Sequence, residues 1–365
     1  MLTVGVDARV LGKPEPTGVS RYTASLLGAL GDGHADDAEF VLFGLDDRPA
    51  SLDAADGLRL APEPAPHSGL RAHLWEQVRL PVALRRYDLD VFHAPAGAPP
   101  YTGTPTVATI HDISPVVHPE WFSAAYGALY RLLTAHTVRT ADRIVTVSGF
   151  ARDEIVERYP AAAERTVPIH NGVTPRDRSA GSPVASLDGE AFLLFVGAMN
   201  PRKNLRTLVE SYDRYRDRVE DPATLALAGP SREVFADGDA PRPEGVRTLG
   251  FVPESTLSWL YREATAFVFP SLYEGFGLPI LEAMSAGTPV ITSNRGAMAE
   301  VAGDAALLVD PERPAALADA MERVTAAKTV RDDLRRRGRV RARAFTWERA
   351  ARRTMAVYRE VADGR

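Results

Sequence analysis

The chain has 365 residues, of which 45% are hydrophobic and 25% are charged, and its net charge at pH 7 is −5. This length predicts two domains of ordinary size, and the composition is typical of a globular protein in water. The charge gives no indication of nucleic-acid binding, and the absence of cysteine excludes disulfides and cysteine metal sites. The N-terminus lacks the features of a signal peptide, and no apolar run approaches the ~20 residues that span a bilayer, so we expect a cytoplasmic protein.

The first half of the sequence alternates short apolar runs with helical patterns. The expected elements are a strand at 3–7, a loop at 12–18, a helix at 21–30, a strand at 40–43 and a loop at 46–69. Thr17 or Ser20 could cap the helix. A strand, a glycine loop and a helix form the first unit of a Rossmann-like domain. A complete GxGxxG is missing, so a plain strand-to-helix turn is the alternative.

Residues 75–86 predict a helix that is interrupted at Pro81. The helix mixes apolar residues such as Trp75 and Val78 with several arginines. A basic amphipathic stretch can lie on an anionic membrane surface, and an ordinary surface helix is the alternative. Peripheral contact with the inner surface of a membrane is therefore one of the interactions that the sequence allows.

Polar side chains follow three later strands of the first half. His111 and Asp112 close the apolar run at 106–110, Ser148 follows a run at 142–147, and Asn171 follows a run that begins at Val167. Polar residues at the C-terminal ends of parallel strands face the ligand crevice, so His111 is a candidate site residue and Asp112 could orient its ring. Ser148 could instead cap the next helix, at 151–158, and Asn171 with Gly172 could form a simple turn.

A second alternating series follows a linker at 175–190, which is rich in proline, serine and glycine and has no periodicity. Its expected strands lie at 192–196, 224–228, 246–250, 266–269, 290–292 and 305–309. Two such series indicate two Rossmann-like domains with a cleft between them. Residues 331–365 predict an arginine-rich helical tail with one buried face, and its charged face is expected to be solvated.

The stretch at 266–292 is the most informative. It predicts a strand, a polar loop with Glu274, a helix with Pro279 at its first position and Gly287 just past its end, and another strand. Glu282 lies on this helix, eight residues after Glu274. The free amides at the helix start form an anion site. Carboxylates for sugar hydroxyls beside amides for phosphate predict a nucleotide-sugar pocket.

Together these motifs resemble the family 4 retaining glycosyltransferases, which have the GT-B fold. The motifs are the stretch with Glu274 and Glu282, residues 195–205, the pair His111–Asp112, residues 17–22 and residues 170–173. They span nearly the whole chain in the order that the family has. The segment that starts at His111 is most similar to bacterial mannosyltransferases that build lipopolysaccharide or similar glycans.

The resemblance implies an α/β GT-B fold in which two Rossmann-like domains face each other across a cleft. The expected bounds are 1–174 for an N-terminal acceptor domain, 175–190 for the linker, 191–344 for a nucleotide-sugar donor domain and 345–365 for a C-terminal helix that packs back on the first domain. The implied reaction moves a hexose, with mannose from GDP-mannose as the best guess, to a glycan or lipid-linked acceptor. UDP-, ADP- or dTDP-sugars are the alternative donors, and a non-catalytic sugar-nucleotide binder is the alternative from another class.

The resemblance also assigns catalytic roles to charged residues. Arg202 and Lys203 would stabilise the negative charge that develops on the departing diphosphate, and Lys203 is one of only three lysines in the chain. Glu274 would bind the donor sugar, and His111 would lie near its anomeric centre or its O6. Many relatives carry arginine where this chain has Ala198, so the charge would depend more on Arg202 and Lys203.

The remaining implied roles concern binding. Glu282 would bind the ribose hydroxyls, and Gly18 would allow close approach of the backbone to phosphate or acceptor. Backbone amides for the donor would come from Gly275, Phe276, Gly277 and Leu278. The doublet Asp88 and Asp90 could be mistaken for a metal-binding motif, but GT-B enzymes generally work without metal, so no metal or other cofactor is expected.

Overall fold

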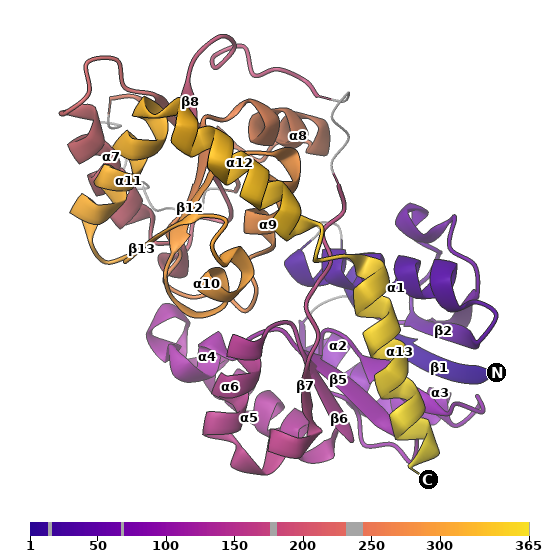
Figure 1. Cartoon of the computed structure of the whole chain (residues 1–365). Coiled ribbons are helices and arrows are strands. Elements are labelled where there is room, and N and C mark those ends of the chain that lie inside the picture. Colours follow the sequence, from indigo (N-terminus) through magenta and orange to yellow (C-terminus); the bar gives the residue numbers. More distant parts are fainter. Residues whose placement is uncertain (14–16, 67–68, 176–180, 231–243, 365) are drawn as a thin grey trace. The chain divides into compact units, whose positions relative to one another are not determined.

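The computed structural model describes residues 1–13, 17–66, 69–175, 181–230 and 244–364. The chain divides into two compact units, of which unit 1 comprises Met1–Gly172 with Thr346–Arg365 and unit 2 comprises Val173–Phe345. Each unit is a parallel sheet with helices packed around it (Figure 1). The predicted α/β class is therefore confirmed, and the last helix of the chain belongs to the first unit.

Unit 1 is built on a seven-stranded sheet in the order β3-β2-β1-β4-β5-β6-β7. The strands are β1 (Leu2–Asp7), β2 (Ala38–Gly44), β3 (Leu58–Pro64), β4 (Val91–Ala94), β5 (Thr106–Ile110), β6 (Arg143–Thr146) and β7 (Thr166–Pro168). The predicted loop at 46–69 is wrong where it includes β3. This strand lies at the sheet edge, where Pro62 and Pro64 are tolerated because half of the backbone groups have no strand to pair with.

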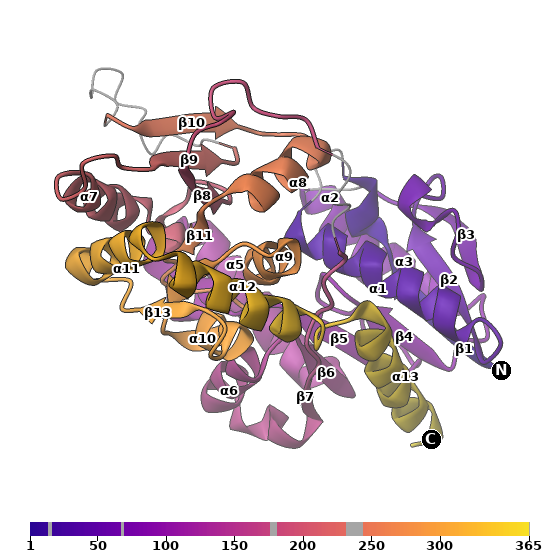
Figure 2. The same cartoon turned by 45° about the horizontal axis from the view of Figure 1, so that its top comes forward.

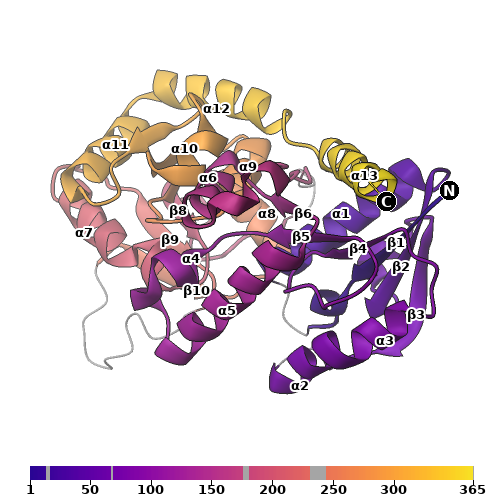
Figure 3. The same cartoon turned by 90° about the horizontal axis from the view of Figure 1, so that it is seen from below.

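The helices of unit 1 cover both faces of its sheet. They are α1 (Gly18–His34), α2 (Gly69–Leu74), α3 (Leu80–Leu84), α4 (Ser114–Val117), α5 (Ala124–Thr140), α6 (Gly149–Arg158) and α13 (Trp347–Asp363). The connection through α1 moves one way along the sheet, and those through α3, α5 and α6 move the other way. Right-handed crossovers therefore place α1 on one face and α3, α5 and α6 on the opposite face. Figure 3 shows α1 and α13 on one side of this sheet and α2, α3 and α5 on the other.

Two helix predictions in unit 1 need correction. The first helix begins at Gly18 rather than Arg21, because Thr17 accepts a hydrogen bond from the Ser20 amide and forms a capping box with it. The predicted break at Pro81 is also wrong. A π-helical turn at Trp75–Arg79 joins α2 to α3, and Pro81 lies in the first turn of α3, where its missing N–H needs no partner.

The helix α13 is held on unit 1 by a buried polar network as well as by apolar packing. The Tyr358 hydroxyl lies 2.6 Å from His93 Nδ1 in β4, and His93 Nε2 lies 2.9 Å from the Thr109 hydroxyl in β5. Both ring nitrogens of His93 are thus engaged, and the ring is fully enclosed. Burial lowers the pKa of His93 to about 3, so the ring is neutral in the folded protein near pH 7.

Unit 2 is built on a six-stranded sheet in the order β10-β9-β8-β11-β12-β13. The strands are β8 (Phe192–Val196), β9 (Thr224–Ala228), β10 (Val246–Gly250), β11 (Ala266–Phe269), β12 (Val290–Ser293) and β13 (Leu307–Val309). Figure 2 shows β8, β9 and β10 beside one another. The inner strands are apolar and buried, as expected for a parallel sheet that helices cover on both faces.

The helices of unit 2 are α7 (Leu205–Arg216), α8 (Glu254–Glu263), α9 (Leu278–Ala286), α10 (Gly296–Ala302), α11 (Pro314–Ala326) and α12 (Lys328–Ala342). The tail predicted at 331–365 is two helices, α12 and α13, because Thr346 starts a new helix by accepting the Arg349 amide. Of the predicted linker, residues 176–180 lie outside the described part of the chain. Among the described residues, no helix combines the length and the apolar character needed to cross a bilayer.

Candidate active site

The loops after β8 and β11 meet at the carboxyl end of the unit 2 sheet, where the two strands are neighbours. The Asn204 side chain donates to the carbonyl oxygens of Pro270 (3.2 Å) and Pro311 (2.7 Å), and the Leu272 amide donates to the Arg202 carbonyl (2.8 Å). Asn204 adopts a positive φ of 59°, which ends the short 3-10 turn at Pro201–Lys203. These bonds hold the two loops against each other and fix the side chains that they carry.

Three predicted site residues are in direct contact on these loops. Lys203 Nζ lies 2.6 Å from Glu274 Oε1, and Arg202 Nη1 lies 3.1 Å from Glu274 Oε2. Lys203 and Glu274 are each only 7% exposed, and the lysine ammonium also lies 4.4 Å from the centre of the Phe269 ring. A lysine is seldom buried unless it is paired, and the ion pair with Glu274 explains how this loop can enclose Lys203.

The electrostatics of this cluster keep Glu274 ionised. Burial alone raises the pKa of Glu274, but the charges of Lys203 and Arg202 more than offset it, so that the pKa lies below its ordinary value. The carboxylate can therefore accept hydrogen bonds but cannot supply a proton near neutral pH. The arrangement suits the binding of sugar hydroxyls rather than general acid catalysis.

The helix α9 provides the second part of the predicted donor site. Gly277 precedes it with a φ of 94°, Pro279 lies in its first turn, and Gly287 follows its end with a φ of 88°. The amides of Gly277 and Leu278 lie at the positive end of the helix. Gly275 and Phe276 belong to the loop before it, and the Phe276 ring is buried and packs 6.0 Å from the Phe345 ring, so only its backbone is suited to ligand binding.

Glu282 lies on α9 and is 8% exposed. Its Oε2 accepts a hydrogen bond of 2.9 Å from the Tyr261 hydroxyl on α8. Tyr261 is fully buried and fixes the direction of the carboxylate. Tyr261 could not be predicted as a site residue from the sequence, because its partner is 21 positions away and no spacing rule joins a tyrosine on one helix to a glutamate on another.

In unit 1, His111 follows β5 and is held by two neighbours. Its Nε2 donates to the Pro95 carbonyl at 2.9 Å, and the Tyr22 ring meets it edge-on at 4.7 Å. Burial lowers the pKa of His111, which leaves Nδ1 as the unprotonated nitrogen of a neutral ring. The prediction that Asp112 orients this ring is wrong. Asp112 Oδ1 instead accepts from the amide (2.9 Å) and the hydroxyl (2.6 Å) of Ser114, at the start of α4.

The other unit 1 candidates differ in their surroundings. Gly18 is the first residue of α1, and an added Cβ would meet nothing within 4 Å. Ser148 is fully buried and its hydroxyl accepts the Ala151 amide at 3.0 Å, so it caps α6 as the alternative interpretation proposed. Asn171 is 7% exposed, and among the described residues its side-chain oxygen has no hydrogen-bond partner. A buried acceptor without a partner is compatible with a ligand there.

A further charged cluster in unit 1 was missed. Arg9 Nη2 lies 2.6 Å from Asp7 Oδ2 and 2.8 Å from Glu76 Oε1, and all three side chains are largely buried. Burial, together with the charge of Asp7, raises the pKa of Glu76 to about 8. Asp7 is the last residue of β1, and a polar residue at the C-terminal end of a parallel strand is the same signal that made His111 a candidate.

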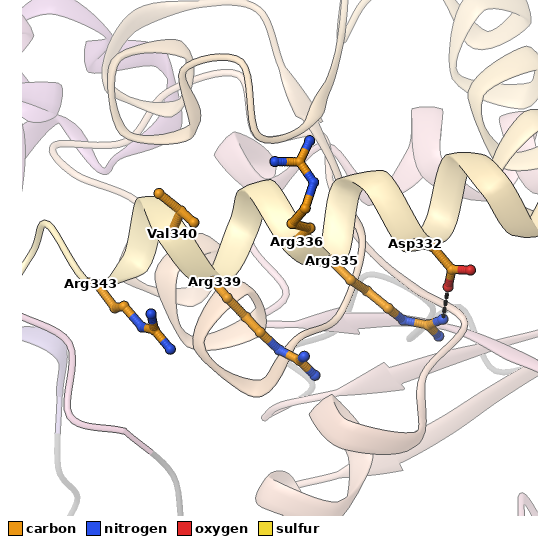
Figure 4. A pocket seen from close by; sticks show the side chains of 6 residues that line it. All are labelled: Asp332, Arg335, Arg336, Arg339, Val340 and Arg343. Atoms are coloured by element: carbon orange, nitrogen blue, oxygen red, sulfur yellow. Dashed lines mark hydrogen bonds and ion pairs between the residues drawn. The ribbon is translucent and has the colours of Figure 1, made fainter.

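Two other charged features, the Asp88–Asp90 doublet and the helix α12, contain none of the predicted site residues. Asp90 of the Asp88–Asp90 doublet accepts the Thr3 amide at 2.8 Å. Among the described residues, no three His, Asp or Glu side chains are grouped to hold a metal ion. A shallow hollow along α12 is lined by Asp332, Arg335, Arg336, Arg339, Val340 and Arg343 (Figure 4). Arg335 pairs with Asp332 at 3.3 Å, as expected on a solvated charged helix.

Comparisons with known proteins cover both units. A family model described as "Glycosyl transferases group 1" matches residues 182–341, and one described as "Glycosyltransferase Family 4" matches residues 16–177. The O-antigen chain mannosyltransferase B of Escherichia coli is 33% identical over 289 residues, which cover 76% of this chain and 76% of that protein. A glycogen synthase of Mycobacterium tuberculosis is 32% identical over 289 residues, which cover 76% of this chain and 68% of that protein.

Among solved structures, the sucrose-phosphate synthase of Thermosynechococcus elongatus superposes with a TM-score of 0.74 at 21% identity. The match covers 100% of both chains. At this identity the similarity concerns the fold alone, and it extends over every element described above.

Proposed function

Because the chain belongs to the group 1 glycosyltransferases and has the GT-B fold, we propose that it transfers mannose from GDP-mannose to a glycan or lipid-linked acceptor with retention of configuration. Glycosyl transfer follows from the family, and the predicted family and fold are confirmed. The choice of mannose is supported by the similarity to the O-antigen mannosyltransferase of E. coli. The similar identity to a glycogen synthase keeps UDP-, ADP- and dTDP-sugars as alternative donors.

The observation that carries the proposal is the cluster of Arg202, Lys203 and Glu274 at the carboxyl ends of β8 and β11. In the reaction the bond between the anomeric carbon and the diphosphate oxygen breaks, and the acceptor oxygen bonds to that carbon. The leaving diphosphate gains negative charge and takes the acceptor proton. Arg202, Lys203 and the amides at the start of α9 supply the positive charge and dipole that this leaving group needs.

The carboxylates have binding roles in this proposal. Glu274 accepts hydrogen bonds from donor-sugar hydroxyls, which are charge-assisted and therefore directional. Glu282, which the Tyr261 hydroxyl holds in place, accepts from the ribose. In unit 1, His111 offers Nδ1 to the donor sugar, and Asn171 offers its buried oxygen to the ligand. Gly18 leaves room for the acceptor or a phosphate. Ser148 and Asp112 stabilise the starts of α6 and α4 by accepting backbone amides there.

We further propose that no divalent metal is needed, because Arg202, Lys203 and the N-terminus of α9 would supply the positive charge that the departing diphosphate needs. Transfer in the presence of a chelator should proceed at the rate measured without it. A loss of activity that Mg²⁺ or Mn²⁺ restores would contradict this part of the proposal.

A thermal-shift panel of GDP-, UDP-, ADP- and dTDP-sugars tests the donor, since a ligand that binds only the folded state raises its apparent stability. We expect the largest rise with GDP-mannose, together with its slow hydrolysis. Glu274→Ala and Lys203→Ala should abolish turnover in protein that still folds. Lys328→Ala is a matched control, because this exposed lysine pairs only with the neighbouring Asp332 in the described structure. Unchanged turnover in both site variants would refute the site, and a larger shift with another sugar would reassign the donor.

A further inference from the structure

Exposed apolar side chains are concentrated on one side of unit 1. In the described part of the chain, twelve large apolar residues are exposed, and eight of them lie on or beside α2, α3 and α5. These eight, which we call the apolar face, are Leu74, Val78, Val82, Tyr101, Tyr126, Leu129, Tyr130 and Leu132. Isolated exposed apolar residues need no explanation, but a group of this size indicates an interaction surface.

The part of the apolar face on α2 and α3 does not contribute to the core. Leu74, Val78 and Val82 recur every four residues and are 54%, 61% and 52% exposed. The opposite side of the same helical stretch packs in the core, where Trp75 and Leu80 belong to a buried cluster with strand residues. The exposed stripe therefore contributes little to the hydrophobic core of unit 1 and is available to contact a partner.

The part on α5 is aromatic and carries no negative charge. Phe122, Tyr126 and Tyr130 stack in series, with ring centres 5.3 Å and 4.3 Å apart. Leu129 and Leu132, which is 71% exposed, continue the stripe along the helix. Residues 124–140 contain no aspartate or glutamate. A surface helix in water ordinarily carries both acidic and basic residues on its outer side, whereas the only charged residues of α5 are arginines.

The two stripes form one surface because the loop between β4 and β5 joins them. The Gln77 amide donates to the Ala98 carbonyl at 3.4 Å, and His136 Nε2 of α5 donates to the Pro99 carbonyl at 2.7 Å. Tyr101 on this loop is 72% exposed, and its ring meets His136 at 4.8 Å. The helices α2, α3 and α5 also lie on the same side of the sheet (Figure 3), so their outer sides point the same way.

The charge on this surface is positive. Its exposed arginines are Arg71, Arg79, Arg85, Arg131 and Arg139, and Arg86 beside them is paired with Glu63 at 2.5 Å. The only acidic residue in 69–87 is Glu76, which is buried and lies 2.8 Å from Arg9. Arginines beside tyrosines and aliphatic side chains in a chain of net charge −5 are complementary to an anionic lipid surface.

We propose that the apolar face docks on the surface of an anionic lipid bilayer. The aliphatic and aromatic side chains enter the interface between headgroups and acyl chains, and the arginines reach the lipid phosphates. Each arginine near an anionic leaflet strengthens binding about fivefold at moderate salt, and the effect weakens as salt screens it. The proposal does not depend on the identity of the donor, and it would bring unit 1 to lipid-linked acceptors.

Co-sedimentation of the full chain with vesicles tests the proposal. The vesicles contain phosphatidylcholine with or without phosphatidylglycerol, and salt is varied. We expect binding to the anionic vesicles that falls with salt. Arg79→Ser/Arg131→Ser should weaken it about 25-fold. Val78→Ser/Leu132→Ser should weaken it at least tenfold, because two apolar side chains no longer enter the interface. Val340→Ser/Phe251→Ser is the matched control, since these unit 2 residues are 62% and 77% exposed, and it should bind like the wild type.

Three outcomes would overturn the proposal. The first is that the wild type does not bind anionic vesicles, and the second is that both double variants bind them as the wild type does. The third is concentration-dependent self-association that the variants abolish, without any lipid binding, and this result would assign the apolar face to a second copy of the chain. Circular dichroism checks that the variants fold. Hydrolysis of the donor in solution should be the same in all of them, so a failure of lipid binding is distinguishable from a failure of the proposed reaction.

Discussion

Replacing Glu274 by glutamine tests the charge arrangement of the donor site. Without ligand, Lys203 and Arg202 are both directed at this carboxylate. A diphosphate that takes up the two cations has to draw them from Glu274. Glutamine keeps the shape and one acceptor oxygen but removes the charge. We therefore expect Glu274→Gln to bind the nucleoside diphosphate more tightly, although it transfers sugar more slowly.

The magnitude follows from the two contacts of 2.6 Å and 3.1 Å. A hydrogen bond to a charged group contributes about 1.5–3 kcal/mol. Because the glutamine amide has only one acceptor oxygen, Glu274→Gln loses one of the two contacts, which removes about 2 kcal/mol. A difference of about 2 kcal/mol corresponds to roughly 30-fold tighter binding. Turnover depends on the lost charge at the sugar hydroxyls, and kcat/KM should fall about 10–100-fold.

Isothermal titration with GDP, or with whichever nucleotide gives the largest thermal shift, measures the affinity. Lys203→Met should change the affinity in the opposite direction, because it removes a diphosphate ligand. Glu312→Gln is a matched control, since this exposed glutamate pairs with Arg295 at 2.6 Å on the surface of unit 2. Weaker nucleotide binding by Glu274→Gln than by the wild type would refute the inference that Lys203 and Arg202 leave the carboxylate for the diphosphate.

Three further predictions concern other parts of the molecule. Tyr261→Phe removes the hydroxyl that holds Glu282, and we expect donor KM to rise about 5–10-fold with little change in kcat; an equal loss in kcat would argue against a ribose role. Folding lowers the pKa of His93 from 6.5 to about 3. The contribution of the neutral ring to the free energy of unfolding is therefore complete above pH 6.5 and is lost as pH falls toward 3, and the loss at pH 5 is about 2 kcal/mol. Urea unfolding of the wild type and His93→Gln should differ in this pH dependence, and parallel curves would exclude His93 as its source. Asn171→Ala removes a buried acceptor without a described partner, so it should leave stability within about 0.5 kcal/mol and lower affinity for one substrate; a large loss of stability would show that the oxygen is paired.

Much of the fold was predictable because its strands are buried on both sides. The runs at 192–196 and 224–228 are almost wholly apolar, and both are strands with the same bounds in the structure. The strand β3 escaped prediction because, at the sheet edge, it alternates apolar residues with arginine, glutamate and proline. The π-helical turn before Pro81 was equally hidden, since nothing in the residues 75–79 distinguishes it from an ordinary α-helical turn.

The candidate site was predictable in its residue types but not in its contacts. The sequence and the family resemblance indicated Lys203 and Glu274, which are 71 positions apart, yet neither revealed that they form a buried ion pair. That pair arises because two neighbouring parallel strands bring their following loops together. The same distance in sequence concealed the link from Tyr261 to Glu282 and the position of Arg9 between Asp7 and Glu76. Asp112 was misassigned because adjacency in sequence does not decide which group a short side chain meets.

The placement of α13 has a consequence for the order in which the protein can be made. Residues 346–365 complete unit 1, and they are synthesised only after the whole of unit 2 has been synthesised. Until then the surface of α1 that α13 covers is exposed to solvent, and the Tyr358 hydroxyl is missing beside His93. On the ribosome the first unit should therefore remain unfinished throughout the synthesis of the second. Chaperones and proteases would accordingly meet the most vulnerable surface of this enzyme at the opposite end of the chain from the residues that complete it.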